Sequence, residues 1–167
     1  MSENHQETAV LAALPLSVPH PGRARTITAG EIRLLSAVSE CADDDLTVAD
    51  VIHSAGAAVD AHLVLPLVVS LTSSSTLLRE LEREHGLVTV AALSHRCALG
   101  APINADDTIT TESEIVAARA SSSRPGHYVM TVRDVGVNQH GMEVAQIDRV
   151  LLLRHDAAMR ETKIAEG

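Results

Sequence analysis

The chain has 167 residues and a formal charge of −9, from 13 basic and 22 acidic side chains. Its length predicts one domain, which buries roughly two thirds of the surface that the unfolded chain exposes. The acidic excess argues against a nucleic-acid partner, and the lack of a run of about twenty apolar residues or of a signal peptide predicts a cytoplasmic protein with no membrane partner.

The first third of the chain is predicted to contain a lead-in and two helices. Residues 1–14 are expected to be a disordered lead-in. A capping box begins the first helix, because Thr28 can cap the first-turn amides while Glu31 reaches back to the Thr28 amide. The acidic residues 43–45 interrupt the apolar pattern, and Asp44 or Asp45 can cap a short second helix over about residues 48–54.

A long, mostly apolar helix is predicted over residues 66–85. Pro66 suits a first helical position, and Gly86 suits the position just after a helix. The early part of this segment is apolar on nearly all sides, which is typical of a helix enclosed by a sheet.

Strand-like runs follow this helix. The first covers residues 87–99, and three further runs alternate with period two around residues 109–113, 128–133 and 144–152. A cramped turn carrying Pro102, a loop at residues 121–126 and a hairpin turn at 138–141 separate them. The order predicts an α+β class and resembles the hotdog fold, an antiparallel sheet wrapped around a long central helix, over residues 15–156. Residues 157–167 are expected to form a charged tail.

Four segments resemble the MaoC-like branch of the hotdog superfamily, which contains (R)-specific enoyl-CoA hydratases and 3-hydroxyacyl dehydratases. They are residues 22–31 at the first helix, 63–70 at the central helix, 101–109 with the family's P-v-x-x-G-D-t-l turn, and 137–141 with its n-q-x-G hairpin. The resemblance covers about residues 20–155. It implies a homodimer or hotdog heterodimer that holds an acyl-CoA or acyl-carrier-protein thioester where two central helices meet.

The catalytic motif of that family is altered here. Active members carry D-x-N-P-x-H after the first helix, and the best alignment puts Asp44 at the Asn, Asp45 at the Pro and Thr47 at the His. A threonine hydroxyl does not titrate near neutral pH, so it cannot replace the histidine as a proton shuttle. Pro66 lies near the family's oxyanion amide and has no N–H to donate, although Leu67 could donate instead.

Two functions therefore stay open. A relocated acid–base couple, of Asp43 or Asp44 with His53 or of Asp60 with His62, would support an acyl-thioester dehydratase or hydratase with altered catalytic residues. The alternative is a non-catalytic hotdog subunit that binds an acyl chain and supports a catalytic partner. The residues predicted to contact the substrate in either case are Thr47, Pro66, Leu67 and His95.

Neither a metal nor a cofactor is predicted. Cys41 and Cys97 are far apart and lack a Cys/His metal spacing, which favours free thiols in a reducing compartment. The acidic run at 43–45 has no His or carboxylate partner at ligand spacing, so it is interpreted as a solvated turn and helix cap. Tyr128 is the single aromatic residue. A pocket in this chain would therefore suit an aliphatic ligand.

Overall fold

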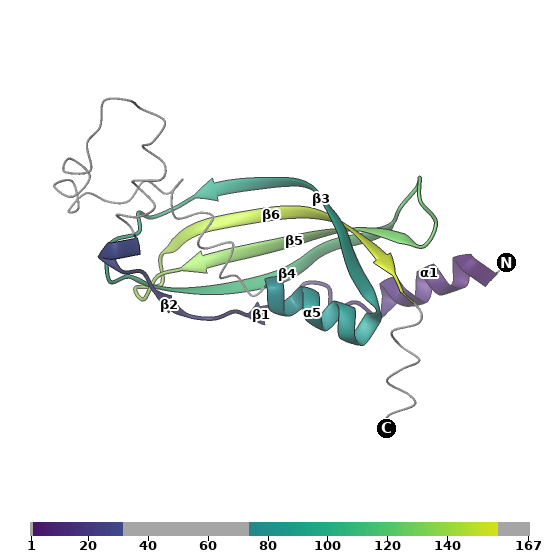
Figure 1. Ribbon diagram of the computed structural model, residues 1–167, viewed down its shortest axis with the longest axis horizontal. Coiled ribbons are helices and arrows are strands. Elements are labelled where there is room, and N and C mark those ends of the chain that lie inside the picture. Colours follow the sequence, from purple (N-terminus) through teal and green to yellow (C-terminus); the bar gives the residue numbers. More distant parts are fainter. Residues whose placement is uncertain (1, 32–73, 157–167) are drawn as a thin grey trace, which may run out of the picture.

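The protein forms an antiparallel sheet that curves around a helix, seen in a computed structural model that describes residues 2–31 and 74–156 (Figure 1). The described elements are α1 (Ser2–Ala12), β1 (His20–Pro21), β2 (Arg25–Thr26), α5 (Ser74–His85), β3 (Leu87–Leu99), β4 (Thr108–Ala120), β5 (His127–Val137) and β6 (Glu143–His155). The order across the sheet is β1-β4-β5-β6-β3, and β2 also pairs with β4. One edge is thus covered by β1 and β2, whereas β3 forms the other edge.

The strands confirm the predicted meander. β3 has the bounds predicted for the first strand, and the loops at residues 121–126 and 138–141 lie where the turn residues predict them. Asp106 adopts a left-handed backbone with φ of 71°. It occupies the glycine position of the P-v-x-x-G-D-t-l turn, and Asp tolerates this conformation better than most residues do.

Strand β3 bends because its pairing with β6 is interrupted twice. The register shifts between Thr89 and Ala91 and again between Ala92 and Ser94, so Val90 and Leu93 are extra residues on β3. Bulges of this kind bend a strand and increase its twist. Figure 1 shows the resulting curve of β3, which leads from the end of α5 to the edge of the sheet.

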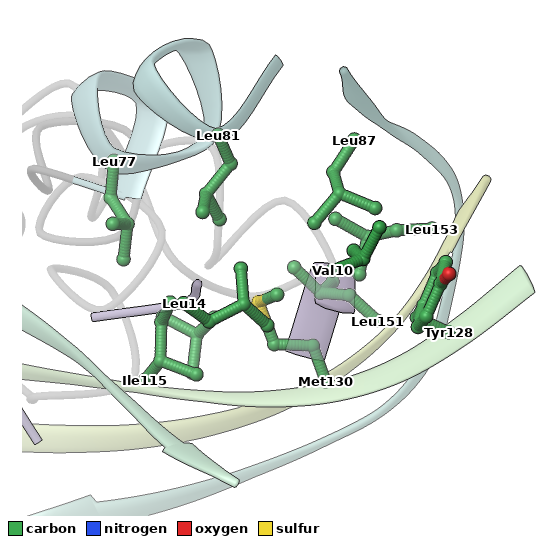
Figure 2. Close-up of a cluster of buried hydrophobic side chains, with 11 residues drawn as sticks. Val10, Leu14, Leu77, Leu81, Leu87, Ile115, Tyr128, Met130, Leu151 and Leu153 are labelled. Carbon is green, nitrogen blue, oxygen red and sulfur yellow. The ribbon is translucent and has the colours of Figure 1, made fainter. Parts of the chain in front are cut away.

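Helix α5 supplies the described part of the central helix. Leu77 and Leu81 lie on one face of α5 and are 0% and 1% exposed. They point toward Ile115, Met130 and the other apolar side chains of the sheet (Figure 2). We call the sheet face that α5 covers the inner face. Residues 66–73 of the predicted helix lie outside the described residues. None of the helices of the described residues is long and apolar enough to span a membrane.

Gly86 ends α5 as predicted. Its φ is +64°, and a Cβ atom there would lie 2.7 Å from the backbone oxygen of Asp156. The Gly86 amide donates to the carbonyl of Glu82, and the Asp156 amide donates to the carbonyl of Gly86. Glycine is therefore needed both to stop the helix and to let the end of β6 approach it.

The N-terminal segment differs from the disordered lead-in predicted for residues 1–14. The structure has helix α1 there, and Val10 in α1 and Leu14 just after its end are both 7% exposed. They pack with Leu77, Leu87 and Tyr128 in the core (Figure 2). The sequence shows few apolar residues before Val10. The burial of Val10 and Leu14 depends on strands distant in the chain, so the local sequence pattern does not reveal it.

The predicted capping box is confirmed. The Glu31 carboxylate accepts a hydrogen bond from the Thr28 amide at 2.9 Å, and the Glu31 amide donates to the Thr28 hydroxyl at 3.2 Å. Both backbone donors at the start of the helix are satisfied in this way. The remainder of the predicted first helix lies outside the described residues.

Candidate functional site

A charged cluster interrupts the apolar inner face of the sheet. Along β5 the inward positions carry Tyr128, Met130 and Val132, which are at most 1% exposed, and then Asp134, which is also 1% exposed. Arg149 of β6 lies directly opposite Val132, and Ser113 of β4 lies opposite Asp134. Directly opposed residues project from the same face of a sheet. Ser113, Asp134 and Arg149 are called the inner-face cluster below.

The two carboxylate oxygens of Asp134 have different partners. The Ser113 hydroxyl donates to Oδ1, and Arg149 Nε donates to Oδ2 at 2.8 Å. Arg149 Nη2 lies 2.6 Å from the same Oδ2. The side chain of Arg149 is 16% exposed and that of Asp134 is 1% exposed. Solvent thus contacts Arg149 more than it contacts Asp134.

Burial raises the pKa of Asp134 above its ordinary value. The charge of Arg149 and the hydrogen bonds from Ser113 and Arg149 oppose this rise, and the charge of Asp148 adds to it. Ionised groups in an apolar interior cost free energy even when they are paired. A carboxyl group with a raised pKa is also suited to exchanging a proton. The cluster therefore lowers folding stability and supplies a group for acid–base chemistry.

Two further polar groups extend the inner-face cluster across the sheet. His95 of β3 lies directly opposite Arg149 and is exposed, on the edge strand. Thr111 of β4 is 3% exposed, and its hydroxyl has no hydrogen-bond partner among the described residues. The polar groups therefore span β4, β5, β6 and β3 and reach solvent at the β3 edge.

A second polar arrangement joins the two turns that resemble the MaoC-like family. Asp107 Oδ2 accepts the Asn104 amide at 2.7 Å, and Oδ1 accepts the Gln139 side-chain amide at 2.7 Å. The Gln139 Oε1 atom accepts the Thr108 amide at 2.8 Å. We call these contacts the turn clasp. It ties the β3–β4 turn to the β5–β6 hairpin, which gives both motif segments a structural role.

Replacing Asp107 by Asn is expected to lower the free energy of unfolding by about 1–3 kcal/mol at pH 7, since an amide cannot accept both bonds. Burial alone would raise the pKa of Asp107, but the bonds from Asn104 and Gln139 and the charge of His140 lower it overall. The stabilisation is therefore present above the ordinary value of 3.8 and is lost as pH falls through the lowered pKa.

Urea denaturation of both proteins from pH 7 to pH 2 checks this expectation. Asp106→Asn is the matched control, because Asn also tolerates the left-handed backbone, and it should change the free energy of unfolding by less than about 0.5 kcal/mol. A constant difference between Asp107→Asn and wild type across the acid range would contradict the role of the carboxylate.

Most site residues predicted from the sequence lie outside the described residues. Among the predicted residues only His95 is described, and it is exposed on β3 beside Arg149. The predicted residues that lie outside the described ranges are Asp43, Asp44, Thr47, His53, Asp60, His62, Pro66 and Leu67. Their roles stay predictions.

The sequence does contain a signal for the inner-face cluster. Asp134 stands in phase with Tyr128, Met130 and Val132, and Arg149 stands in phase with Ile147 and Leu151. A charged residue in the apolar phase of a strand indicates a buried charge, and two such strands that are neighbours indicate a pair. Within the described ranges, no group of three or more His, Cys, Asp or Glu side chains could hold a metal ion.

Solved structures similar to this chain have the same fold. A MaoC-like dehydratase from Rhodospirillum rubrum is 17% identical, with 87% of this chain and 97% of that chain covered and a TM-score of 0.62. A (3R)-hydroxyacyl-ACP dehydratase complex from Mycobacterium tuberculosis is 14% identical, with 81% and 94% covered and a TM-score of 0.57. No family model and no curated protein matches the sequence.

A third similar structure carries the fold name. It is a Mycobacterium tuberculosis protein described as a double hotdog fold, which is 18% identical, with 88% of this chain and 44% of that chain covered and a TM-score of 0.60. The chain has the hotdog fold, and the predicted resemblance to MaoC-like dehydratases is confirmed at the level of structure.

Proposed function

We propose that this protein binds acyl thioesters of CoA or of a carrier protein and acts on them as a MaoC-like dehydratase or hydratase with altered catalytic residues. The observation that carries the proposal is the inner-face cluster. Its buried ion pair occupies positions where apolar side chains would pack at lower cost, and charges kept at such a cost are concentrated at functional sites. The dehydratases with a similar fold support the thioester as substrate class.

The proposed reaction needs an acid and a base. Dehydration breaks the C3–O bond of a 3-hydroxyacyl thioester, with the leaving hydroxyl protonated to water, and removes a proton from C2 as the double bond forms. Asp44 with His53, or Asp60 with His62, are the proposed donor and acceptor. The contacts proposed for the acyl thioester are Thr47, Pro66, Leu67 and His95. The reaction needs no metal or redox cofactor, and a cytoplasmic location is proposed with it.

An assay of the purified full chain tests the proposal. A panel of 3-hydroxyacyl-CoA and 2-enoyl-CoA thioesters is incubated with the protein, and mass spectrometry follows the gain or loss of water. Turnover that survives Thr47→Ala but falls at least about 100-fold in His53→Ala or His62→Ala would support a relocated acid–base couple. Absence of turnover from a folded protein that also binds none of the thioesters would exclude the proposal.

The threonine at the motif histidine favours a second candidate function. With Thr47 at that position, the chain is proposed alternatively as a non-catalytic subunit that binds the acyl chain and supports a catalytic hotdog partner. Binding of the thioesters without turnover, by a chain with an unchanged circular dichroism spectrum, would favour this alternative over the enzyme.

We further propose that the β3 edge pairs with a second copy of this chain. Two exposed apolar side chains, Val90 and Leu93, are 48% and 52% exposed on β3, and residues 94–98 beyond the bulges are regular and exposed. An unpaired regular edge can pair antiparallel with its own copy about a two-fold axis, which makes a closed, isologous interface.

A native mass of twice the 17.6 kDa chain is therefore expected. Leu93→Asp and Ala98→Asp each place a charge at the edge and should shift the protein toward the monomer, because pairing would take the charge out of water. Light scattering during gel filtration measures the mass. Met142→Asp, at a similarly exposed apolar residue of the β5–β6 hairpin, is the control. A dimer that persists in both edge variants would refute pairing through β3.

A further inference from the structure

We propose that Arg149, together with His95 on the neighbouring strand, binds an anionic group of the ligand. The anion is either a carboxylate on the acyl chain or a phosphate of the carrier arm. The inference deepens the proposed function and rests on it for the thioester that carries this anion. It assigns substrate binding to the inner-face cluster.

The two cross-strand arginine pairs of the sheet differ in how they are satisfied. On the outer face, Arg133 donates to both oxygens of Asp148, from Nε to Oδ1 at 2.8 Å and from Nη2 to Oδ2 at 3.2 Å. On the inner face, Arg149 contacts only Oδ2 of Asp134, and the Ser113 hydroxyl donates to Oδ1. A guanidinium can bind both oxygens of a carboxylate at once. Arg133 does so, whereas Arg149 binds a single oxygen.

The incomplete pair directs two donors at one oxygen. Arg149 Nε and Nη2 lie 2.8 Å and 2.6 Å from Asp134 Oδ2. The Arg149 side chain is 16% exposed, and a bound anion would accept from the exposed part of its guanidinium.

The neighbouring groups suit the same ligand. His95 is exposed directly opposite Arg149, so it lies on the side from which solvent reaches the cluster. Its imidazole can donate a second hydrogen bond to an oxygen that Arg149 holds. Arg149 and His95 are thus neighbouring donors on one face of the sheet, which favours one small anionic group.

Directed hydrogen bonds are needed because the chain as a whole repels anions. The formal charge is −9, and Asp134 already balances the charge of Arg149. A carboxylate or phosphate would be held by charge-assisted hydrogen bonds, which are about twice as strong as neutral ones. An uncharged acyl chain would gain nothing from Arg149, so the cluster discriminates between acyl groups that are otherwise alike.

Isothermal titration of the full-length protein with three thioesters separates the sources of the anion. Glutaryl N-acetylcysteamine carries a carboxylate and no phosphate, butyryl-CoA carries phosphates and no acyl carboxylate, and butyryl N-acetylcysteamine carries neither. Arg149→Gln is compared with Arg133→Gln, the matched control on the outer face. Loss of one charged hydrogen-bonding partner should raise Kd about 10-fold to 100-fold.

Two outcomes support the proposal. If Arg149→Gln, but not Arg133→Gln, binds only the glutaryl ester more weakly, the anion is on the acyl chain. If the same variant binds only butyryl-CoA more weakly, the anion is on the carrier arm. His95→Gln should give a smaller loss for the same ligand. Equal Kd values for Arg149→Gln and wild type, or equal losses in both arginine variants, overturn the proposal.

A measurement on the wild-type protein covers the case in which Arg149→Gln does not fold or no thioester binds. Phenylglyoxal modifies accessible arginines, and free glutarate and inorganic phosphate are the competing probes. Protection of Arg149, but not of Arg133, would support the anion site even where a lack of thioester binding had excluded the proposed function. Equal modification of Arg149 with and without both probes would exclude the site.

Discussion

Replacing Asp134 by Ala is expected to lower the free energy of unfolding by about 3–5 kcal/mol, because it leaves the Arg149 charge buried without a counter-ion. The double variant Asp134→Leu/Arg149→Met is expected to be as stable as wild type or more stable by about 1–4 kcal/mol. Its apolar side chains would pack with Val132 and Ile147 on the inner face. Urea denaturation followed by circular dichroism measures both changes.

The outer-face pair provides the control for this experiment. Arg133 and Asp148 are 34% and 26% exposed, so the double variant Arg133→Met/Asp148→Leu should change the free energy of unfolding by only about 0–1 kcal/mol. The pH dependence has a defined sign as well. Because the pKa of Asp134 is raised, its contribution to stability falls as pH rises from the ordinary value of 3.8 through the raised pKa, and the inner-face double variant should lack this contribution.

A stabilised double variant that no longer binds thioesters would show that the protein keeps the ion pair for function at a cost in stability. A double variant as unstable as Asp134→Ala would instead mean that the pair is part of what holds the sheet together. That result would remove the main support for placing a site on the inner face.

Replacing Tyr128 by Ala is expected to lower the free energy of unfolding by about 3–5 kcal/mol, as is typical when a buried aromatic ring is removed. Tyr128 is 1% exposed and contacts the core between α1, α5 and the sheet (Figure 2). The chain has no Phe or Trp that could refill the space. Burial also raises the pKa of the Tyr128 hydroxyl, and the charge of Glu7 raises it further.

Tyr128→Phe is the control, because it keeps the ring and removes only the hydroxyl. It should change the free energy of unfolding by less than about 1.5 kcal/mol, and thermal and urea denaturation by circular dichroism serve for all three proteins. A loss below about 1 kcal/mol in Tyr128→Ala would show that the aliphatic side chains around the ring collapse into the cavity.

The sequence was sufficient for the parts of the fold that depend on local chemistry. The bounds of β3, the capping box of Thr28 and Glu31, and the glycine stop at Gly86 are all as predicted. Each depends on side chains a few residues apart, so spacing alone reveals it. Helix α1 depends on contacts between Val10 and distant strands, and the local pattern predicted disorder there instead.

The inner-face cluster was missed for a similar reason. The family motif directs attention to histidine and aspartate near residues 41–62. Asp134 and Arg149 belong to strands that were assigned by their apolar phase, and their partnership appears only once β5 and β6 are placed side by side. Pairing across a sheet joins residues far apart in sequence, which a search for short motifs does not detect.

The place of β3 at the edge of the sheet affects the order in which the strands form. Strands β4, β5 and β6 follow one another through short connections, whereas β3 pairs only with β6, so Leu87 meets His155 at the opposite end of this stretch. Closing the longer loop costs more chain entropy, and we expect β5 amides to be protected before β3 amides in pulsed hydrogen exchange. Simultaneous protection would contradict this order. The strand proposed to meet a second copy then joins the sheet after β5, so protomers would form the centre of the sheet before they assemble.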